Sequence, residues 1–190
     1  FRDGAPTDTS VAGHVADSVS MRDVARQRNF WAIALTFGLF FCCMSATLTH
    51  MVPRLTDMGH SLSSASLIMS LCAGLGVLGK LSFGALLDRL AVRRVLLLIL
   101  VVQLGGQITM YATDAYWTFA VGAALFGFGV GGAVPTQASV VGRTFGAARF
   151  GAVFGLMRPA MFPIQIVGVP LAGWVFDLTG SYDHAFEILF

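Results

Sequence analysis

Residues 62–94 read LSSASLIMSLCAGLGVLGKLSFGALLDRLAVRR, and this stretch decides the fold. Its first part, residues 62–87, holds a single charged side chain, Lys80, among apolar and small residues. A helix of about 20 such residues is long enough to cross the hydrocarbon core of a bilayer. A cluster of charges follows at once, formed by Asp88, Arg89, Arg93 and Arg94. The stretch therefore predicts a membrane-spanning helix that ends in a basic hairpin.

Similar apolar runs stand on both sides of this one. Each run is continuous rather than alternating, which favours a helix over a strand of a membrane barrel. Most charged residues lie in the gaps between runs, and Pro53 is expected to close the first run. The predicted fold is therefore all-α, a polytopic membrane helical bundle. We expect spans at about 30–51, 62–87, 95–111, 117–141 and 152–176, and the start of a sixth at 185–190.

The composition agrees with a protein embedded in lipid. The 190 residues are 56% hydrophobic and 12% charged, and the mean hydropathy is +0.76. A soluble domain carries about 25% charged residues. The net charge of +2 gives no indication of a nucleic-acid partner. The cysteines, Cys42, Cys43 and Cys72, lie in apolar runs without metal-ligand spacing, so we expect neither a metal site nor a cofactor.

Positive charges separate the two sides of the predicted bundle. One set of loops is rich in arginine, whereas the alternate loops carry only Arg54. Cytoplasmic loops of membrane proteins are enriched in Lys and Arg, so the arginine-rich side is expected to be cytoplasmic. A polar linker, residues 1–28, would then precede a helical domain at 29–190 in the plasma or cell inner membrane. The arginines of the rich side are Arg22, Arg26, Arg28, Arg89, Arg93, Arg94, Arg143 and Arg149.

The two ends of the sequence suggest a piece of a longer protein. The chain starts at Phe1 without a methionine and stops at Phe190 inside an apolar run. We therefore expect an amino-terminal half that is missing from this sequence. The linker is expected to be mostly disordered and to become helical near residues 21–27.

Two cations inside the predicted spans, Lys80 and Arg158, are the main candidates for a binding site. A charge near the bilayer centre costs about 2.5–3.5 kcal/mol on insertion scales, so such residues usually face the interior and serve function. Counted from the span midpoints, both are expected at a similar depth, roughly 9 Å from mid-membrane. Together they would hold an anion, because Arg and Lys both bind carboxylates. The alternative is snorkelling, in which each side chain stretches to the headgroups.

Other polar and small residues in the spans receive weaker assignments. Gln165 and Gln137 are further candidates for substrate contact, although interhelical hydrogen bonding is the commoner role for such residues. The same interhelical role is expected for Gln103, Gln107 and His50. Three prolines in the fifth span, Pro159, Pro163 and Pro170, suggest a helix that lines a cavity. Its Gly151 and Gly155 form a GxxxG pair of the kind that packs helices closely.

The hairpin Gly84-Ala-Leu-Leu-Asp88-Arg89-Leu-Ala-Val-Arg93-Arg94 resembles the loop that the major facilitator superfamily carries after its second and eighth helices. Ala91 stands where that loop prefers glycine. The fifth span and the segment 176–186 resemble the eleventh helix of the branch that holds oxalate/formate antiporters and monocarboxylate transporters. The resemblance implies the carboxyl-terminal six-helix half of a transporter, with cations at Lys80 and Arg158. It also implies a cytoplasmic gate, in which Asp88 pairs with loop arginines and with the helix start near 149–152.

The leading hypothesis is a secondary transporter of small organic anions, mono- or dicarboxylates, which works by alternating access as an antiporter. Its expected partners are the lipid bilayer, the missing half and the anion. A second hypothesis is efflux of drug-like or zwitterionic compounds by the same fold. A third is a membrane receptor or scaffold that does not transport. A membrane-embedded enzyme is disfavoured, because the first five predicted spans contain no Asp or Glu and His50 stands alone.

Overall fold

The computed structural model of the chain describes residues 21–112 and 114–179, and these residues contain helices and no strand. The prediction of an all-α bundle is confirmed. The short helix expected near residues 21–27 is present as α1, and the sixth span expected at 185–190 lies outside the described residues. The elements are α1 (Met21–Ala25), α2 (Arg28–Asp57), α3 (Leu62–Arg89), α4 (Val92–Tyr111), α5 (Tyr116–Gly131), α6 (Ala133–Phe145) and α7 (Ala147–Thr179).

Within residues 21–112 and 114–179, five segments are long and apolar enough to cross a membrane. Helices α2, α3 and α4 provide one each, α5 and α6 together form the fourth, and Ala147–Leu171 of α7 is the fifth. Many large apolar side chains on these segments are exposed, including Leu67, Val77 and Leu81. Such an apolar exterior is stable against lipid or against another apolar body rather than against water.

Two helix boundaries differ from the sequence prediction. Pro53 does not end the first helix, because α2 continues through it to Asp57. Pro53 lacks the N–H that would bond the Thr49 carbonyl, and a membrane helix tolerates this loss where neighbouring groups satisfy the backbone. The fourth run is interrupted at Gly132, between α5 and α6. A Cβ at this glycine would lie 2.6 Å from Phe83, so the interruption occurs where the chain passes closely over α3.

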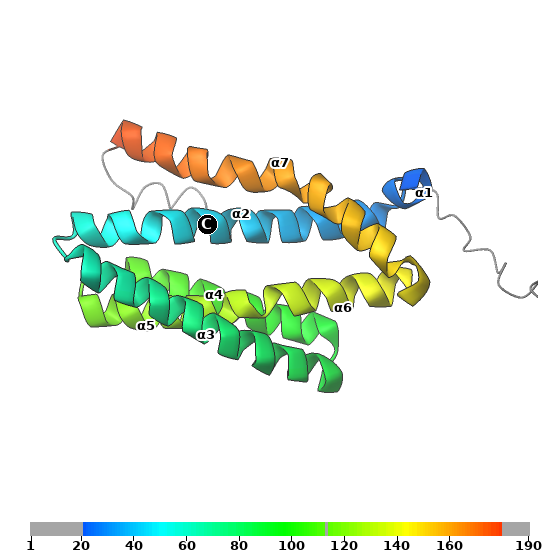
Figure 1. Cartoon of the computed structure of the whole chain (residues 1–190), viewed down its shortest axis with the longest axis horizontal. Coiled ribbons are helices and arrows are strands. Elements are labelled where there is room, and N and C mark those ends of the chain that lie inside the picture. The colour runs from blue at the N-terminus through cyan, green and yellow to red at the C-terminus, as the bar shows by residue number, and fades with distance from the viewer. Residues whose placement is uncertain (1–20, 113, 180–190) are drawn as a thin grey trace, which may run out of the picture.

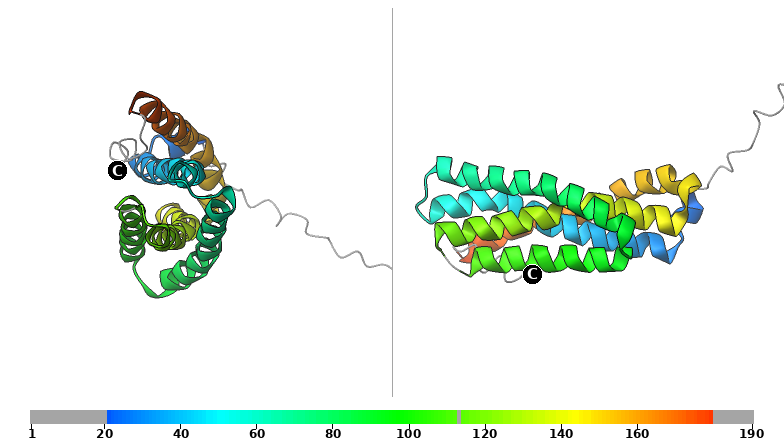
Figure 2. Two further views of the ribbon diagram at one scale, coloured as in Figure 1. Left: turned by 90° about the vertical axis from the view of Figure 1, so that its left-hand side faces the viewer. Right: turned by 90° about the horizontal axis from the view of Figure 1, so that it is seen from below.

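Helix α2 runs through the middle of the bundle, with α7 on one side and α3 to α6 on the other (Figure 1). Figure 2 shows the bundle end-on, where α3 to α6 form the larger group and α2 with α7 the smaller. Glycines allow the backbones of the larger group to touch. A Cβ at Gly79 would collide with the Phe128 carbonyl, and one at Gly127 with the Cys72 carbonyl. The close packing expected of small residues is therefore confirmed for α3 against α5.

Other glycines have open space around them. A Cβ at Gly74, Gly84, Gly151 or Gly155 would meet no described atom within 4 Å. The GxxxG pair of α7 thus makes no close helix contact within the part of the chain that the structure describes. Its small residues leave a shallow face on the outside of α7.

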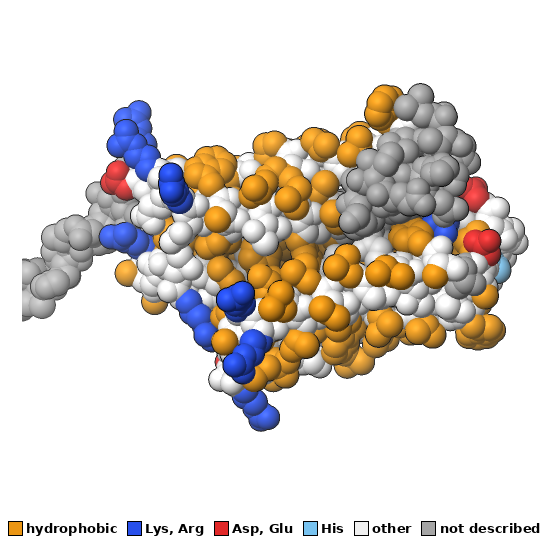
Figure 3. Space-filling model, turned by 180° about the vertical axis from the view of Figure 1, so that it is seen from behind, with side chains coloured by type: hydrophobic (Ala, Val, Ile, Leu, Met, Phe, Trp, Pro, Cys, Tyr) orange, Lys and Arg blue, Asp and Glu red, His pale blue; other side chains and the backbone are white. Residues whose placement is uncertain are grey.

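Arginine side chains gather at one end of the bundle, and Figure 3 shows them beyond a wide hydrophobic belt. We call this end the basic end. It holds the start of α2 at Arg28, the α3–α4 hairpin with Arg89, Arg93 and Arg94, and the turn between α6 and α7. The alternation of basic and non-basic connections expected from the sequence is therefore present in three dimensions.

Candidate functional site

Lys80 continues a row of residues on one side of α3. Met69, Ala73 and Gly76 precede it at spacings that keep all four residues on one helix face. The Lys80 residue is exposed, and its backbone lies against α5, where a Cβ at Gly131 would be 2.8 Å from the Lys80 nitrogen. Lys80 therefore stands at the seam between α3 and α5 with its side chain open to the exterior of the chain.

An apolar cavity of about 240 Å³ opens along this row. We call it the α2–α3–α5 cavity. Gly76 lies near the middle of α3, and Gly131 near the middle of the Tyr116–Phe145 span, so the cavity is central along the bundle. It is lined by Leu48, Met69, Cys72, Ala73, Gly76, Gly127, Val130 and Gly131.

The helix geometry directs Lys80 toward this cavity. A Cα–Cβ bond on a helix tilts toward the amino terminus of that helix. The amino terminus of α3 lies at the end of the bundle opposite the basic end, so the Cα–Cβ bond of Lys80 tilts toward Gly76. Lys80 follows the middle of α3 by four to five residues, which is roughly 7 Å along the axis. The ammonium group can therefore reach the rim of the cavity.

A second open cavity, of about 410 Å³, lies between α2 and α7. Its lining includes Ser45 of α2 and Gln165 of α7. Arg158 belongs to the same α7 row, because it precedes Phe162, Gln165 and Val169 by four, seven and eleven residues. Ser45 is three residues from Leu48 of the first cavity. The two cavities therefore flank one face of α2.

The two cations stand at different depths. Ile164 lies against Gly38, and Gly168 lies against Cys42, which sets the register between α7 and α2. By this register Arg158 is level with a point on α2 about ten residues from the middle of that helix, on the side of the basic end. This offset is roughly 15 Å along the helix axis. The equal depth expected from the span midpoints was wrong, because α7 extends from Ala147 to Thr179 and is shifted toward the basic end.

The tilt of the side chains separates the cations further. The amino terminus of α7 is at the basic end, so the Cα–Cβ bond of Arg158 tilts away from the bundle centre. Arg158 is exposed and lies where a side chain can reach the level of the headgroups. Between α2 and Leu171 of α7, the acidic residues are Asp57, Asp88 and Asp114, all at helix ends. Within that range Lys80 therefore has no carboxylate at its own level, whereas Asp88 lies at the same end of the bundle as Arg158.

Gln137 and the other buried amides make contacts between helices. Gln137 is 1% exposed, and its amide nitrogen donates to the Met161 sulfur at 3.2 Å. The Gln107 amide donates to the Thr47 hydroxyl at 2.8 Å. A His50 ring nitrogen lies 3.4 Å from the Val169 carbonyl. The interhelical role expected for Gln107 and His50 is confirmed, and Gln137 holds α6 against α7.

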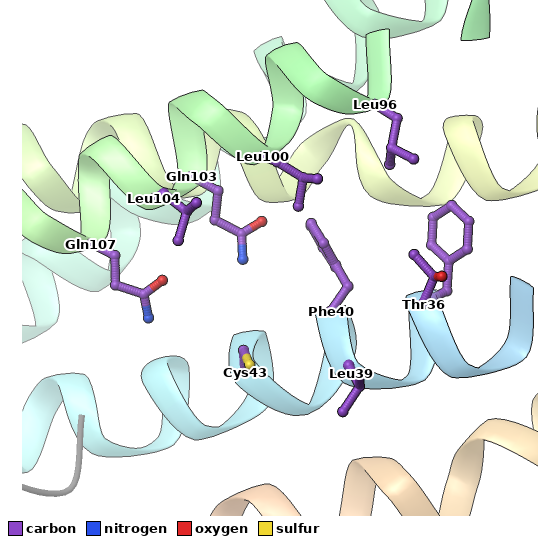
Figure 4. A pocket seen from close by; sticks show the side chains of 10 residues that line it. Thr36, Leu39, Phe40, Cys43, Leu96, Leu100, Gln103, Leu104 and Gln107 are labelled. Atoms are coloured by element: carbon purple, nitrogen blue, oxygen red, sulfur yellow. The ribbon is translucent and has the colours of Figure 1, made fainter. Parts of the chain in front are cut away.

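Gln103 lines a third cavity, of about 220 Å³, between α2 and α4 (Figure 4). Figure 4 shows its side chain and that of Gln107 extending from α4 toward α2 among apolar neighbours. Neither amide oxygen has a hydrogen-bond partner among the described residues. This cavity carries no charged lining residue, and its α2 residues, such as Cys43, face away from Ser45 and Leu48.

Arg143 holds the hairpin after α3. The sequence pattern indicates only a role for this arginine in the orientation of the protein in the membrane. Arg143, in the last turn of α6, donates from Nη2 to the Leu87 carbonyl at 2.9 Å. This contact satisfies one of the free carbonyls at the end of α3 and places a cation there, both of which stabilise a helix carboxyl terminus. Asp88 follows directly and is exposed, as are Arg89, Arg93 and Arg94.

The residues that line the α2–α3–α5 cavity were also missed at the sequence level. Met69, Ala73 and Gly76 carry no chemistry of their own, so only their spacing from Lys80 could have identified them. The position of Leu48 opposite them depends on packing between distant helices. Sequence patterns do not encode that packing.

Comparison with known proteins gives one family. The family model of the Major Facilitator Superfamily matches residues 2–162 and 57–189. Monocarboxylate transporter 13 of Rattus norvegicus is 28% identical over 141 residues, covering 73% of this chain and 33% of that protein. Monocarboxylate transporter 12 of Rattus norvegicus is 27% identical over 163 residues, covering 82% and 32%. The 12-B protein of Danio rerio is 25% identical over 169 residues. The chain spans about a third of the length of these relatives.

Proposed function

This chain belongs to the major facilitator superfamily and is a multi-pass membrane protein, and we propose that it forms the carboxyl-terminal half of a secondary transporter of small organic anions. The proposal rests chiefly on Lys80, an exposed cation near the bundle centre and beside an open cavity, with no acidic residue at its level among the described residues. Exposure of a positive charge to lipid at this depth costs free energy, whereas the same charge in a water-filled chamber attracts anions. The relatives are named monocarboxylate transporters, which favours a carboxylate as the anion.

Lys80 and Arg158 act in sequence rather than as one cradle. Arg158, nearer the basic end, attracts the anion into the chamber, and Gln165 contacts it farther along α7. Lys80 then binds the carboxylate near the centre of the bundle. This division follows from the difference in depth, since one small carboxylate cannot span two cations so separated along the axis. Gln137 contributes by fixing α7 through Met161.

The second wall of the chamber comes from an amino-terminal half of the full protein. The matched residues cover about a third of each relative, which leaves room for such a half. The face that carries Lys80 and Arg158 also carries the open glycines Gly84, Gly151 and Gly155, where another helix can approach closely. Rocking of the two halves about the central site would give alternating access.

The basic end is the cytoplasmic end of a protein in the plasma or cell inner membrane. Eight arginines of its connections support this orientation, because positive loops remain in the cytoplasm. The hairpin with Gly84, Asp88, Arg89, Arg93 and Arg94 forms a gate against the other half, and the exposed Asp88 is free to meet a cation there. Exchange of one anion for another is the proposed mode of transport.

Uptake by the full-length protein in proteoliposomes tests the proposal. L-lactate, pyruvate and succinate serve as labelled probes, with vesicles either empty or preloaded with unlabelled anion. Lys80→Gln should abolish uptake at unchanged protein abundance, whereas Arg26→Gln, a matched loss of charge in the linker, should leave it intact. Stimulation by preloading supports exchange. Full uptake by Lys80→Gln would reject the anion site, and transport of cationic or zwitterionic drugs instead would favour efflux.

A further inference from the structure

We propose that the α2–α3–α5 cavity receives the apolar tail of the transported carboxylate, so that its lining residues determine which substrates are accepted. The inference rests on the proposed function, because it takes Lys80 as the group that binds the carboxylate. It adds a second element of recognition that selects for an apolar chain at the other end of the substrate.

The chemistry of the lining supports this assignment. Five of the cavity's side chains are hydrocarbon or sulfur groups, namely Leu48, Met69, Cys72, Ala73 and Val130, and glycines complete the wall. No lining residue is charged. A carboxylate therefore has no partner inside the cavity, and its burial there would cost far more than the burial of a methyl group. The cavity accepts hydrocarbon and rejects a second charge.

The geometry joins this cavity to the cation. Lys80 lies one helical turn past Gly76, on the side nearer the basic end, and the tilt of its Cα–Cβ bond is toward the cavity. A substrate whose carboxylate meets the ammonium at the rim can therefore direct its tail toward Ala73 and Met69. The Lys80 charge and the hydrocarbon wall form one amphipathic site.

The size of the site is set by residues whose side chains can be changed without touching the cation. Ala73 is exposed and belongs to the row of α3 residues that leads to Lys80. It lines the open side of the cavity. Met69, one turn farther, is partly buried and limits the depth of the cavity. A larger residue at position 73 shortens the space for a tail, and a smaller residue at 69 lengthens it.

Binding of straight-chain carboxylates to the purified full-length protein in detergent tests the inference. The probes are the monocarboxylates from acetate to hexanoate and the dicarboxylate adipate, and the readout is ligand-induced thermal stabilisation, which yields Kd. Detergent solution avoids passive leakage of these acids through vesicles. For the wild type, each added methylene should tighten Kd by about fourfold until the cavity is full. Adipate should bind at least tenfold more weakly than hexanoate.

Variants separate this inference from the proposed function. Ala73→Leu should flatten the chain-length series, so that hexanoate binds no more tightly than acetate, and Met69→Ala should extend the gain to longer acids. Ala85→Leu, a matched change on the opposite face of α3, should behave as wild type. Lys80→Gln should weaken every acid, acetate included. A flat chain-length series in a wild type that depends on Lys80 would overturn the tail site alone. Binding that ignores Lys80 would overturn the anion site and the tail site together.

Discussion

Gly131 of α5 and Lys80 of α3 are in backbone contact, because a Cβ built on Gly131 would lie 2.8 Å from the Lys80 nitrogen and would collide with the Gly76 carbonyl. The contact holds the Lys80 backbone one helical turn beyond Gly76, which lines the cavity. It also explains why glycine occupies position 131, since any side chain there would push α3 away from α5.

We therefore expect Gly131→Ala to destabilise the full-length protein by about 1–3 kcal/mol, the usual cost of overpacking. Thermal unfolding in detergent measures the change. Gly105→Ala is the control, because its Cβ would meet no described atom within 4 Å. Replacing a glycine inside a helix should there stabilise by roughly 0.5–1 kcal/mol. Equal effects at the two sites would contradict the backbone contact.

The hydrogen bond from Gln107 to Thr47 joins α4 to α2 across the third cavity. Thr47→Val removes the acceptor and should cost about 1 kcal/mol, because a buried amide then loses its partner. Thr109→Val is the control, since that hydroxyl bonds only to the Gly105 carbonyl of its own helix. A double-mutant cycle of Thr47→Val with Gln107→Leu should show coupling. Strict additivity would argue against the bond.

Arg143 caps α3 through the Leu87 carbonyl. Arg143→Gln should lower stability by about 0.5–1 kcal/mol, the range for a cation at a helix carboxyl terminus. The same variant should alter the rate of transport more than substrate affinity, since the hairpin belongs to the proposed gate. Arg149→Gln removes an exposed arginine at the start of α7 and provides the comparison. Equal losses in the free energy of unfolding for the two variants would show that the Arg143 contact does not stabilise α3.

The two cations should respond differently to salt. Arg158 lies near the basic end and is exposed, so its attraction for an anion is screened over a Debye length of about 10 Å at 0.1 M salt. Arg158→Gln should raise the KM for lactate at low salt, with a smaller effect at high salt. Lys80→Gln should remove uptake at every salt concentration. A salt-independent defect in Arg158→Gln would place this residue in the binding site itself.

The sequence was sufficient for the class of fold and for the positions of the spans. Helices and closed barrels are the regular structures that satisfy every backbone group in lipid, and continuous apolar runs of this length lack the alternation of barrel strands. Even there, local rules failed at Pro53, where α2 continues, and at Gly132, where a run divides. Contacts between helices decide both places.

The candidate site was predicted only in part. Lys80 and Arg158 stand out in a sequence because charges are rare in apolar runs. Their relative depth depends on the register between helices, and that register is set by contacts such as Gly168 against Cys42. The apolar cavity beside Lys80 is formed by three helices distant in sequence. Neither feature leaves a periodic signal in the chain.

The most direct test replaces the charge of Lys80 chemically. Lys80→Cys is placed in a full-length protein whose other cysteines, Cys42, Cys43 and Cys72 among them, are changed to alanine, and lactate uptake is measured before and after modification. Uptake should be absent in the thiol form. It should return after 2-aminoethyl methanethiosulfonate restores an ammonium group, and disappear again after reduction. A neutral methyl reagent that restores uptake equally well, or a thiol form that transports as the parent does, would contradict the role of Lys80.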